Sequence, residues 1–71
     1  MALGERIKRQ RLAHKLTQQA VAAACGVRRV TIATYERNQV APSLAVAQRL
    51  AALFHCTLEE LLEETPDDPP S

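Results

Sequence analysis

A chain of 71 residues has room for one domain with a single small core, which leaves little space for an enzyme pocket. Aromatic residues make up only 3% of the sequence, so its apolar content comes mainly from Ala, Leu and Val, which favours short, closely packed helices. No apolar run approaches the roughly 18 residues that a membrane span needs, and no signal peptide is evident at the N-terminus, so we expect a cytoplasmic protein.

The formal net charge is only +1, but the charges are unevenly distributed along the chain. All nine Lys and Arg residues precede residue 50, whereas every acidic residue except Glu5 and Glu36 follows it. This polarity favours a molecule that presents a basic face to a polyanion such as nucleic acid and keeps an acidic end away from it. The alternative is that the charges only solvate the outer faces of helices.

Two helices are predicted in the first part of the chain. Apolar residues at helical spacing indicate a first helix that ends near His14, with Leu3, Ile7 and Leu12 along its stripe. Thr17 is a natural N-cap for a second, short helix, which ends at Gly26 because glycine adopts the left-handed turn at little cost. The predicted buried positions of this second helix are Val21, Ala22 and Cys25.

The segment that follows is ambiguous by propensity. Residues 30–35 are rich in β-branched side chains, which by themselves favour a strand. Val27, Ile32 and Tyr35, however, fall on one face of a helix, so we predict a third helix at about residues 28–37. Asn38 is expected to end it in the left-handed conformation, and Pro42 prevents its continuation.

Two more helices and a tail complete the prediction. Ser43 caps a fourth helix whose predicted buried positions are Leu44, Ala47, Leu50, Ala51 and Phe54. Thr57 forms a capping box with Glu60 and begins a fifth helix that carries Leu58, Leu61 and Leu62. The expected fold is all-α with five helices in one domain, residues 1–64, followed by a disordered acidic and Pro-rich tail, residues 65–71.

The second and third helices have the spacing of a helix-turn-helix unit, from Gln18 to Tyr35. A small residue is needed at Ala22, where the two helices cross closely, and a positive φ is needed at Gly26. The chain resembles the XRE/Cro family of bacterial and phage repressors from about Leu3 to Glu64. The matching motifs are Leu16-Thr17-Gln18-Gln19, Gly26-Val27, Thr31-Ile32 with Tyr35-Glu36, Pro42-Ser43 and Leu58-Glu59-Glu60-Leu61-Leu62.

This resemblance implies a lambda-repressor-like domain whose third helix enters the major groove of double-stranded DNA. The positions that it implies as base readers are Arg28, Arg29, Val30 and Thr34. Those that it implies as phosphate contacts are Gln18, Thr31, Arg37, Asn38 and Gln39. It also implies a partly buried ion pair between Arg11 and Glu36, which joins the first helix to the third.

The two arginines at the start of the third helix support this interpretation independently. Arg28 and Arg29 lie at the positive end of a helix dipole, where a cation is unfavourable by about 0.3–1 kcal/mol, so stability does not explain them. A bidentate arginine matches O6 and N7 of guanine, which predicts at least one G·C pair in each half-site.

The chain departs from the family pattern at Arg28, where Ser or Thr often caps the helix, and at Arg37-Asn38, where many members have Asn-Gly.

The sequence offers no support for a metal site, a cofactor, a small-molecule ligand or catalysis. His14, His55, Cys25 and Cys56 lack the close spacing of a structural zinc site, and both cysteines are interpreted as small buried hydrophobes. No residues can be assigned to nucleophilic or acid/base chemistry, and the glutamates near the C-terminus have the pattern of a solvated helix face.

The predicted function is sequence-specific transcriptional regulation, most simply repression, by a nucleoid-associated homodimer. Dimerisation through the C-terminal helices is expected because they carry more apolar residues than one short helix needs, namely Leu53, Phe54, Leu58, Leu61 and Leu62. A phage-type repressor, a controller of a restriction system and a host regulator all fit this prediction. The alternative function is a protein-interaction module, such as an antitoxin that uses the same fold to hold a partner.

Overall fold

The computed structural model describes residues 2–62 and contains five helices within them. These are α1 (Leu3–Ala13), α2 (Gln18–Cys25), α3 (Arg29–Glu36), α4 (Leu44–Leu53) and α5 (Leu58–Leu62). No strand occurs among the described residues, so the prediction of an all-α, five-helix fold is confirmed. The predicted tail, residues 65–71, and the predicted domain boundary at residue 64 lie outside the described range.

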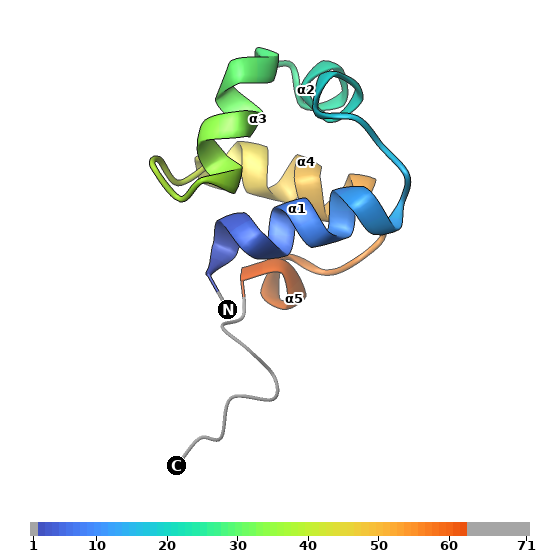
Figure 1. Ribbon diagram of the computed structural model, residues 1–71. Coiled ribbons are helices and arrows are strands. Elements are labelled where there is room, and N and C mark those ends of the chain that lie inside the picture. The colour runs from blue at the N-terminus through green and yellow to red at the C-terminus, as the bar shows by residue number, and fades with distance from the viewer. Residues whose placement is uncertain (1, 63–71) are drawn as a thin grey trace.

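The helices are arranged so that α3 packs against both α1 and α2, while α4 packs against α2 and α5. Figure 1 shows α2 and α3 at one end of the molecule and α5 at the other, with α1 and α4 between them. None of the helices in the described part is long and apolar enough to cross a membrane.

The core lies where the five helices meet, and every helix contributes to it. The segment that propensity would assign to a strand is helical because Ile32 and Tyr35 are buried together on one face of α3. Burial of this face outweighs the weak strand preference of β-branched residues. The buried core cluster consists of Ile7, Val21, Ala22, Cys25, Ile32, Tyr35, Leu50, Ala51, Phe54 and Leu61.

Two predicted core positions are wrong. Leu12 is 56% exposed, because five residues of helix place it about 140° around the axis from the buried Ile7. Arg11 occupies the inward-facing position instead. Leu44 is 62% exposed, because it lies in the first turn of α4, directly after Ser43, where no described helix covers it.

The predicted helix caps are present. Thr17 and Ser43 each accept a hydrogen bond from the backbone N–H three residues later, at 3.0 and 3.2 Å. Thr57 and Glu60 form a reciprocal capping box, in which Thr57 N–H donates to Glu60 Oε1 at 2.8 Å and Glu60 N–H donates to Thr57 Oγ1 at 3.0 Å. These contacts explain why α2, α4 and α5 begin where the sequence predicts.

The predicted left-handed residues also take that conformation. Gly26 has φ +72° and ends α2, and Asn38 has φ +61° just after α3. Lys15 and His55 adopt it as well, both with φ +58°. These two were not predicted: positive φ is uncommon for lysine, and histidine, although enriched there, adopts it far less readily than glycine.

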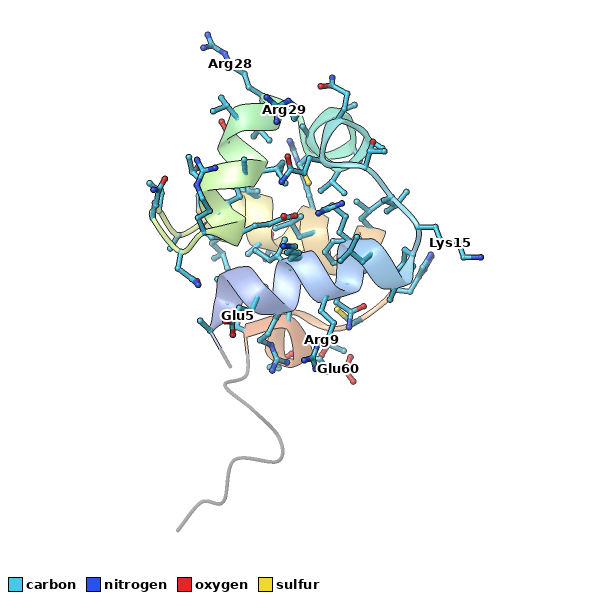
Figure 2. All side chains as sticks on the ribbon, viewed as in Figure 1. Glu5, Arg9, Lys15, Arg28, Arg29 and Glu60 are labelled. Carbon is cyan, nitrogen blue, oxygen red and sulfur yellow. The ribbon has the colours of Figure 1, made fainter. Side chains whose placement is uncertain are left out.

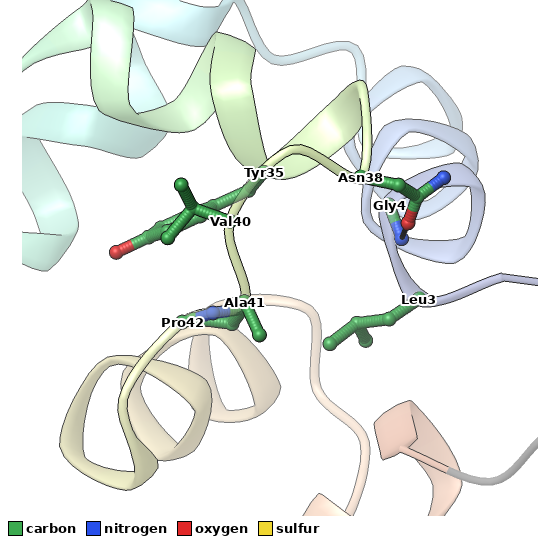
Figure 3. Close-up of a pocket in the computed structure, with 7 residues that line it drawn as sticks. All are labelled: Leu3, Gly4, Tyr35, Asn38, Val40, Ala41 and Pro42. Atoms are coloured by element: carbon green, nitrogen blue, oxygen red, sulfur yellow. Dashed lines mark hydrogen bonds between the residues drawn. The ribbon is translucent and has the colours of Figure 1, made fainter.

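The start of α1 lies directly against the end of α3. The backbone N–H of Gly4 donates to Asn38 Oδ1 at 2.8 Å, so the residue directly after the C-cap of α3 satisfies a backbone N–H in the first turn of α1. Figure 3 shows this corner and residues that line a small hollow there, among them Leu3, Val40 and Pro42. The volume of the hollow is about 70 Å³. The hollow is several-fold smaller than the roughly 300–1,000 Å³ of a ligand pocket.

Candidate nucleic-acid interface

One face of α3 is buried and the start of the helix projects outward. Ile32, Tyr35 and Glu36 face the interior, whereas Arg28 and Arg29 are exposed and Val30 is 51% exposed. Figure 2 shows the Arg28 side chain extending away from the body of the protein at this end. A rigid helix thus carries two guanidinium groups and an apolar side chain at its tip.

The bounds of α3 are one residue shorter at each end than the predicted range of 28–37. Arg28 occupies the N-cap position in an extended conformation and makes no side-chain capping bond to the described backbone of this helix. Arg37 is the C-cap residue. Because Arg28 stands where family members often have Ser or Thr, the cap residue offers no side-chain acceptor to the first N–H groups of α3. The Arg28 guanidinium instead points outward (Figure 2).

The threonines of α3 are both half-buried. Thr34 Oγ1 donates to the backbone oxygen of Thr31 at 2.7 Å, one turn earlier. The Thr34 hydroxyl keeps its capacity to accept a hydrogen bond.

The segment after α3 has a structural role that the sequence did not reveal. Arg37, Asn38 and Gln39 are all exposed, in keeping with a surface that could reach a DNA backbone. Asn38 Oδ1, however, is occupied by the N–H of Gly4. Its side-chain amide nitrogen is therefore the group to consider for a phosphate.

Arg11 and Glu36 lie together as a buried bidentate pair. Arg11 Nε donates to Glu36 Oε2 at 2.6 Å and Arg11 Nη2 donates to Glu36 Oε1 at 3.2 Å, with only 11% and 4% of the two side chains exposed. Arg11 Nη1 also donates to the Leu16 carbonyl at 3.0 Å. The pair joins α1 to α3, and the third bond adds the turn that leads into α2.

Gln18, in the first turn of α2, extends this network to the surface. Its Nε2 donates to Glu36 Oε1 at 3.1 Å, and its Oε1 accepts from Arg29 Nη1 at 3.2 Å. One hydrogen-bonded chain thus runs from Arg11 through Glu36 and Gln18 to Arg29. The family resemblance implied the pair of Arg11 with Glu36, but the links from Glu36 through Gln18 to Arg29 were not predicted.

Two other arginines bind the carbonyl groups at helix ends, although Arg49 is itself exposed. Arg49 Nη1 donates to the carbonyl of Cys25 at 2.9 Å, at the C-terminus of α2. Arg6 Nε donates to the carbonyl of Leu61 at 2.9 Å, and its Nη2 donates to that of Glu60. Both satisfy carbonyl groups that the end of a helix leaves unpaired, and both place a cation at the negative end of a helix dipole.

The basic residues are therefore less concentrated on one face than their sequence positions suggest. Arg28 and Arg29 lie at the α2–α3 end, whereas Arg9 and Glu60 lie at the end formed by α1 and α5 (Figure 2). Glu60 lies far from the start of α3, as expected for an acidic end, but the basic Arg9 lies at the same end of the molecule.

The pKa values of both thiols are raised. Burial raises the pKa of Cys25, an effect that the nearby Arg49 partly opposes. Burial and the Glu60 carboxylate raise the pKa of Cys56, and Arg6 partly opposes them. Cys25 is buried as predicted, whereas Cys56 is only half-buried, because it lies in the turn after α4.

The histidines do not form a ligand cluster with the cysteines. His14 lies with its ring centroid 5.6 Å from that of Phe54 and 5.9 Å from that of His55, and its Nδ1 is 2.9 Å from the Gln10 carbonyl oxygen. Among residues 2–62, no group of three or more His, Cys, Asp or Glu side chains could hold a metal ion.

The apolar surplus predicted for the C-terminal helices is smaller than expected. Phe54 and Leu61 are buried within the protomer, where they belong to the core. Leu53 and Leu58 are half-buried, and Leu62 is 44% exposed. Sequence counting overestimated the surplus because α1 and α4 already cover most of it.

Comparison with known proteins agrees with this geometry. The helix-turn-helix family model matches residues 7–61. An uncharacterized HTH-type transcriptional regulator from Archaeoglobus fulgidus is 38% identical over 56 residues, which cover 79% of this chain and 80% of the relative. The P22 c2 repressor, solved in complex with a synthetic operator, superposes with a TM-score of 0.84 at 30% identity, over 89% of this chain and 96% of the repressor. The restriction-modification controller protein C.AhdI from Aeromonas hydrophila superposes with a TM-score of 0.80 at 30% identity, over 86% and 92% of the two chains. The chain therefore belongs to the helix-turn-helix family of DNA-binding transcriptional regulators.

Proposed function

We propose that the protein binds a symmetric DNA operator as a homodimer, with α3 of each protomer in the major groove. The observation that carries this proposal is the exposed tip of α3, where Arg28, Arg29 and Val30 project from a helix whose opposite face is buried. A helix held in this way can enter a groove without rearranging the fold. The similarity to a repressor that was solved with operator DNA favours repression as the outcome.

The chemistry of the four proposed base readers is complementary to base edges in the major groove. The guanidinium groups of Arg28 and Arg29 match O6 and N7 of guanine, and the exposed Val30 side chain suits the methyl group of thymine. Thr34 lies one turn further along α3 and offers a hydroxyl oxygen and a methyl group. We expect these contacts to determine which sequence is preferred.

The proposed phosphate contacts surround these readers. Gln18 and Thr31 lie near the starts of α2 and α3, and Arg37, Asn38 and Gln39 follow the end of α3. Such contacts set the orientation of the protein on the duplex and contribute affinity for every sequence. We propose that Asn38 acts through its amide nitrogen, because its oxygen already accepts from Gly4.

We propose dimerisation through the C-terminal helices, because a single module of this size contacts few base pairs and two half-sites give useful specificity. Leu62 is the exposed apolar residue of α5, and the half-buried Leu58 belongs to the same helix. Sedimentation of the protein with and without DNA tests this proposal, with Leu62→Glu as the variant expected to weaken association. A wild-type protein that remains monomeric at micromolar concentration even on DNA would contradict it.

We also propose that the protein has no catalytic role. It acts in the cytoplasm, where it is associated with the nucleoid. No cofactor and no small-molecule ligand is part of this proposal. The alternative function, a protein-interaction module, is not favoured, because the relatives carry the names of regulators and repressors.

Selection of bound sequences from a pool of random duplexes tests the proposed function. Wild-type protein should recover one shared sequence, and its affinity should fall steeply with salt because several phosphates are contacted. Arg29→Ala should relax the preference at one base pair by about 1–3 kcal/mol. Arg9→Ala is the matched control, since it removes the same charge at the far end of the molecule (Figure 2). Equal effects of the two variants would contradict the assignment of α3.

A further inference from the structure

Two histidines that are far apart in the chain lie side by side in the fold. His14 is the C-cap residue of α1, and His55 directly follows Phe54, the C-cap residue of α4. The two ring centroids are 5.9 Å apart, with an angle of 32° between the ring planes. The His14 ring also packs against Phe54, at a centroid distance of 5.6 Å. Packing of the helices thus brings together two imidazoles, neither of which belongs to the proposed DNA contacts.

The tautomer of His14 is set by a backbone carbonyl. Its Nδ1 lies 2.9 Å from the carbonyl oxygen of Gln10. A carbonyl oxygen only accepts hydrogen bonds, so Nδ1 carries the proton and, in the neutral ring, Nε2 bears the free lone pair. A metal-binding histidine is oriented in this same way, because its other ring nitrogen almost always donates to a carbonyl, a carboxylate or water. His14 is therefore prepared to bind a metal ion through Nε2.

The separation of the two rings suits a shared ion. A zinc–nitrogen bond is about 2.0–2.1 Å long, so the centroid of a bound imidazole lies about 3.2 Å from the ion. Two imidazoles on one ion are then about 5.2 Å apart at a tetrahedral angle and about 6.4 Å apart on opposite sides of it. The observed separation of 5.9 Å lies between these values. Because His55 is exposed, its side chain can adjust to an ion without disturbing the core.

The surroundings of the two rings also favour a cation. α1 ends at Ala13 and α4 ends at Leu53, so the negative ends of two helix dipoles lie beside the histidines. Lys15, the next residue after His14, has an exposed side chain that extends away from the protein (Figure 2). Water and salt screen its charge there.

We propose that His14 and His55 form a binding site for a divalent transition-metal ion such as Zn²⁺, Ni²⁺ or Cu²⁺, with water in the remaining coordination positions. Imidazole suits these ions, whereas Mg²⁺ and Ca²⁺ prefer oxygen ligands. The ion links the turn after α1 to the turn after α4 and so stabilises the folded protein. Two protein ligands make this site weaker than a closed four-ligand zinc site.

Titration calorimetry of the full chain with Zn²⁺ tests this site, and one ion should bind per protomer. With Zn²⁺ at about ten times its dissociation constant, the midpoint of thermal unfolding should rise by about 5–10 °C. Mg²⁺ at the same concentration should leave the midpoint unchanged. A midpoint that does not respond to Zn²⁺ even at millimolar concentration would overturn the inference.

His55→Asn removes the exposed ligand and introduces a residue that tolerates the positive φ of +58° at this position. It should lower the affinity for Zn²⁺ by at least about tenfold. Cys56→Ser is the matched control, because this neighbouring thiol is another candidate zinc ligand, and its removal should leave the affinity unchanged. If Cys56→Ser lowers the affinity and His55→Asn does not, the assignment to the two imidazoles is wrong.

A measurement on the wild-type protein stays informative even if His55→Asn fails to fold. In nuclear magnetic resonance spectra, Zn²⁺ should shift the Nε2 resonance of His14 together with the ring resonances of His55, and both shifts should be complete at one ion per protomer. Shifts in only one of the two rings, or in neither, would contradict a shared ion.

Discussion

Substitution of Gly4 by alanine tests how tightly α1 is packed onto the end of α3. A Cβ atom at this position would overlap the carbonyl oxygen of Tyr35 and would lie 2.7 Å from the carbonyl oxygen of Glu36. It would also lie 2.7 Å from Asn38 Oδ1, the atom that accepts the N–H bond of Gly4. Two of these three obstacles are backbone atoms, which cannot rotate out of the way. The helices would have to separate.

The expected magnitude follows from opposing terms. Replacing glycine by alanine within a helix normally stabilises it by about 0.5–1 kcal/mol. Overpacking a close contact costs about 1–3 kcal/mol, and the upper part of this range applies to Gly4 because backbone must move. Loss of the bond to Asn38 adds about 1 kcal/mol. The unfavourable terms are larger, so we expect Gly4→Ala to lower the free energy of unfolding by about 2–3 kcal/mol.

Thermal unfolding followed by far-ultraviolet circular dichroism measures this effect. In a domain of this size 1 kcal/mol corresponds to about 4–8 °C, so the midpoint should fall by roughly 10–20 °C. Lys8→Ala, at an exposed position of the same helix, is the control and should change stability by less than about 0.5 kcal/mol. A Gly4→Ala protein as stable as the wild type would contradict this prediction, because ordinary helix propensity would then have prevailed over the contact with α3.

Three further predictions concern the ion pair, a helix cap and the thiols. Glu36→Ala leaves the buried guanidinium of Arg11 without its partner and should destabilise the fold by about 3–5 kcal/mol in urea unfolding; a loss below about 1 kcal/mol would contradict the buried pair. Thr57→Ala removes one half of the capping box and should lower stability by about 1 kcal/mol in thermal unfolding, and no change would show that the cap is dispensable. Because burial raises the pKa of both thiols, a thiol-specific reagent at neutral pH should label the half-buried Cys56 slowly and the buried Cys25 only after unfolding; equal labelling rates would disagree with their burial.

Features that depend on residues close together in the chain could be predicted before the tertiary structure was known. The starts of α2, α4 and α5 follow from Thr17, Ser43 and Thr57, because a cap bonds to a backbone group only a few residues away. The left-handed turns at Gly26 and Asn38 are likewise a local matter of backbone preference. Helical periodicity gave most of the core for the same reason, since it needs only the spacing of residues along one helix.

The contacts of each polar or charged side chain, in contrast, depend on how the helices pack together. Nothing in the local sequence separates Arg6 and Arg49, which bind helix carbonyls, from Arg28, whose side chain extends away from the protein (Figure 2). The close contact at Gly4 and the bonds of Gln18 were equally hidden. All of these depend on groups that are distant in sequence and meet only once the helices have packed, and a long side chain can reach several alternative partners until packing selects one.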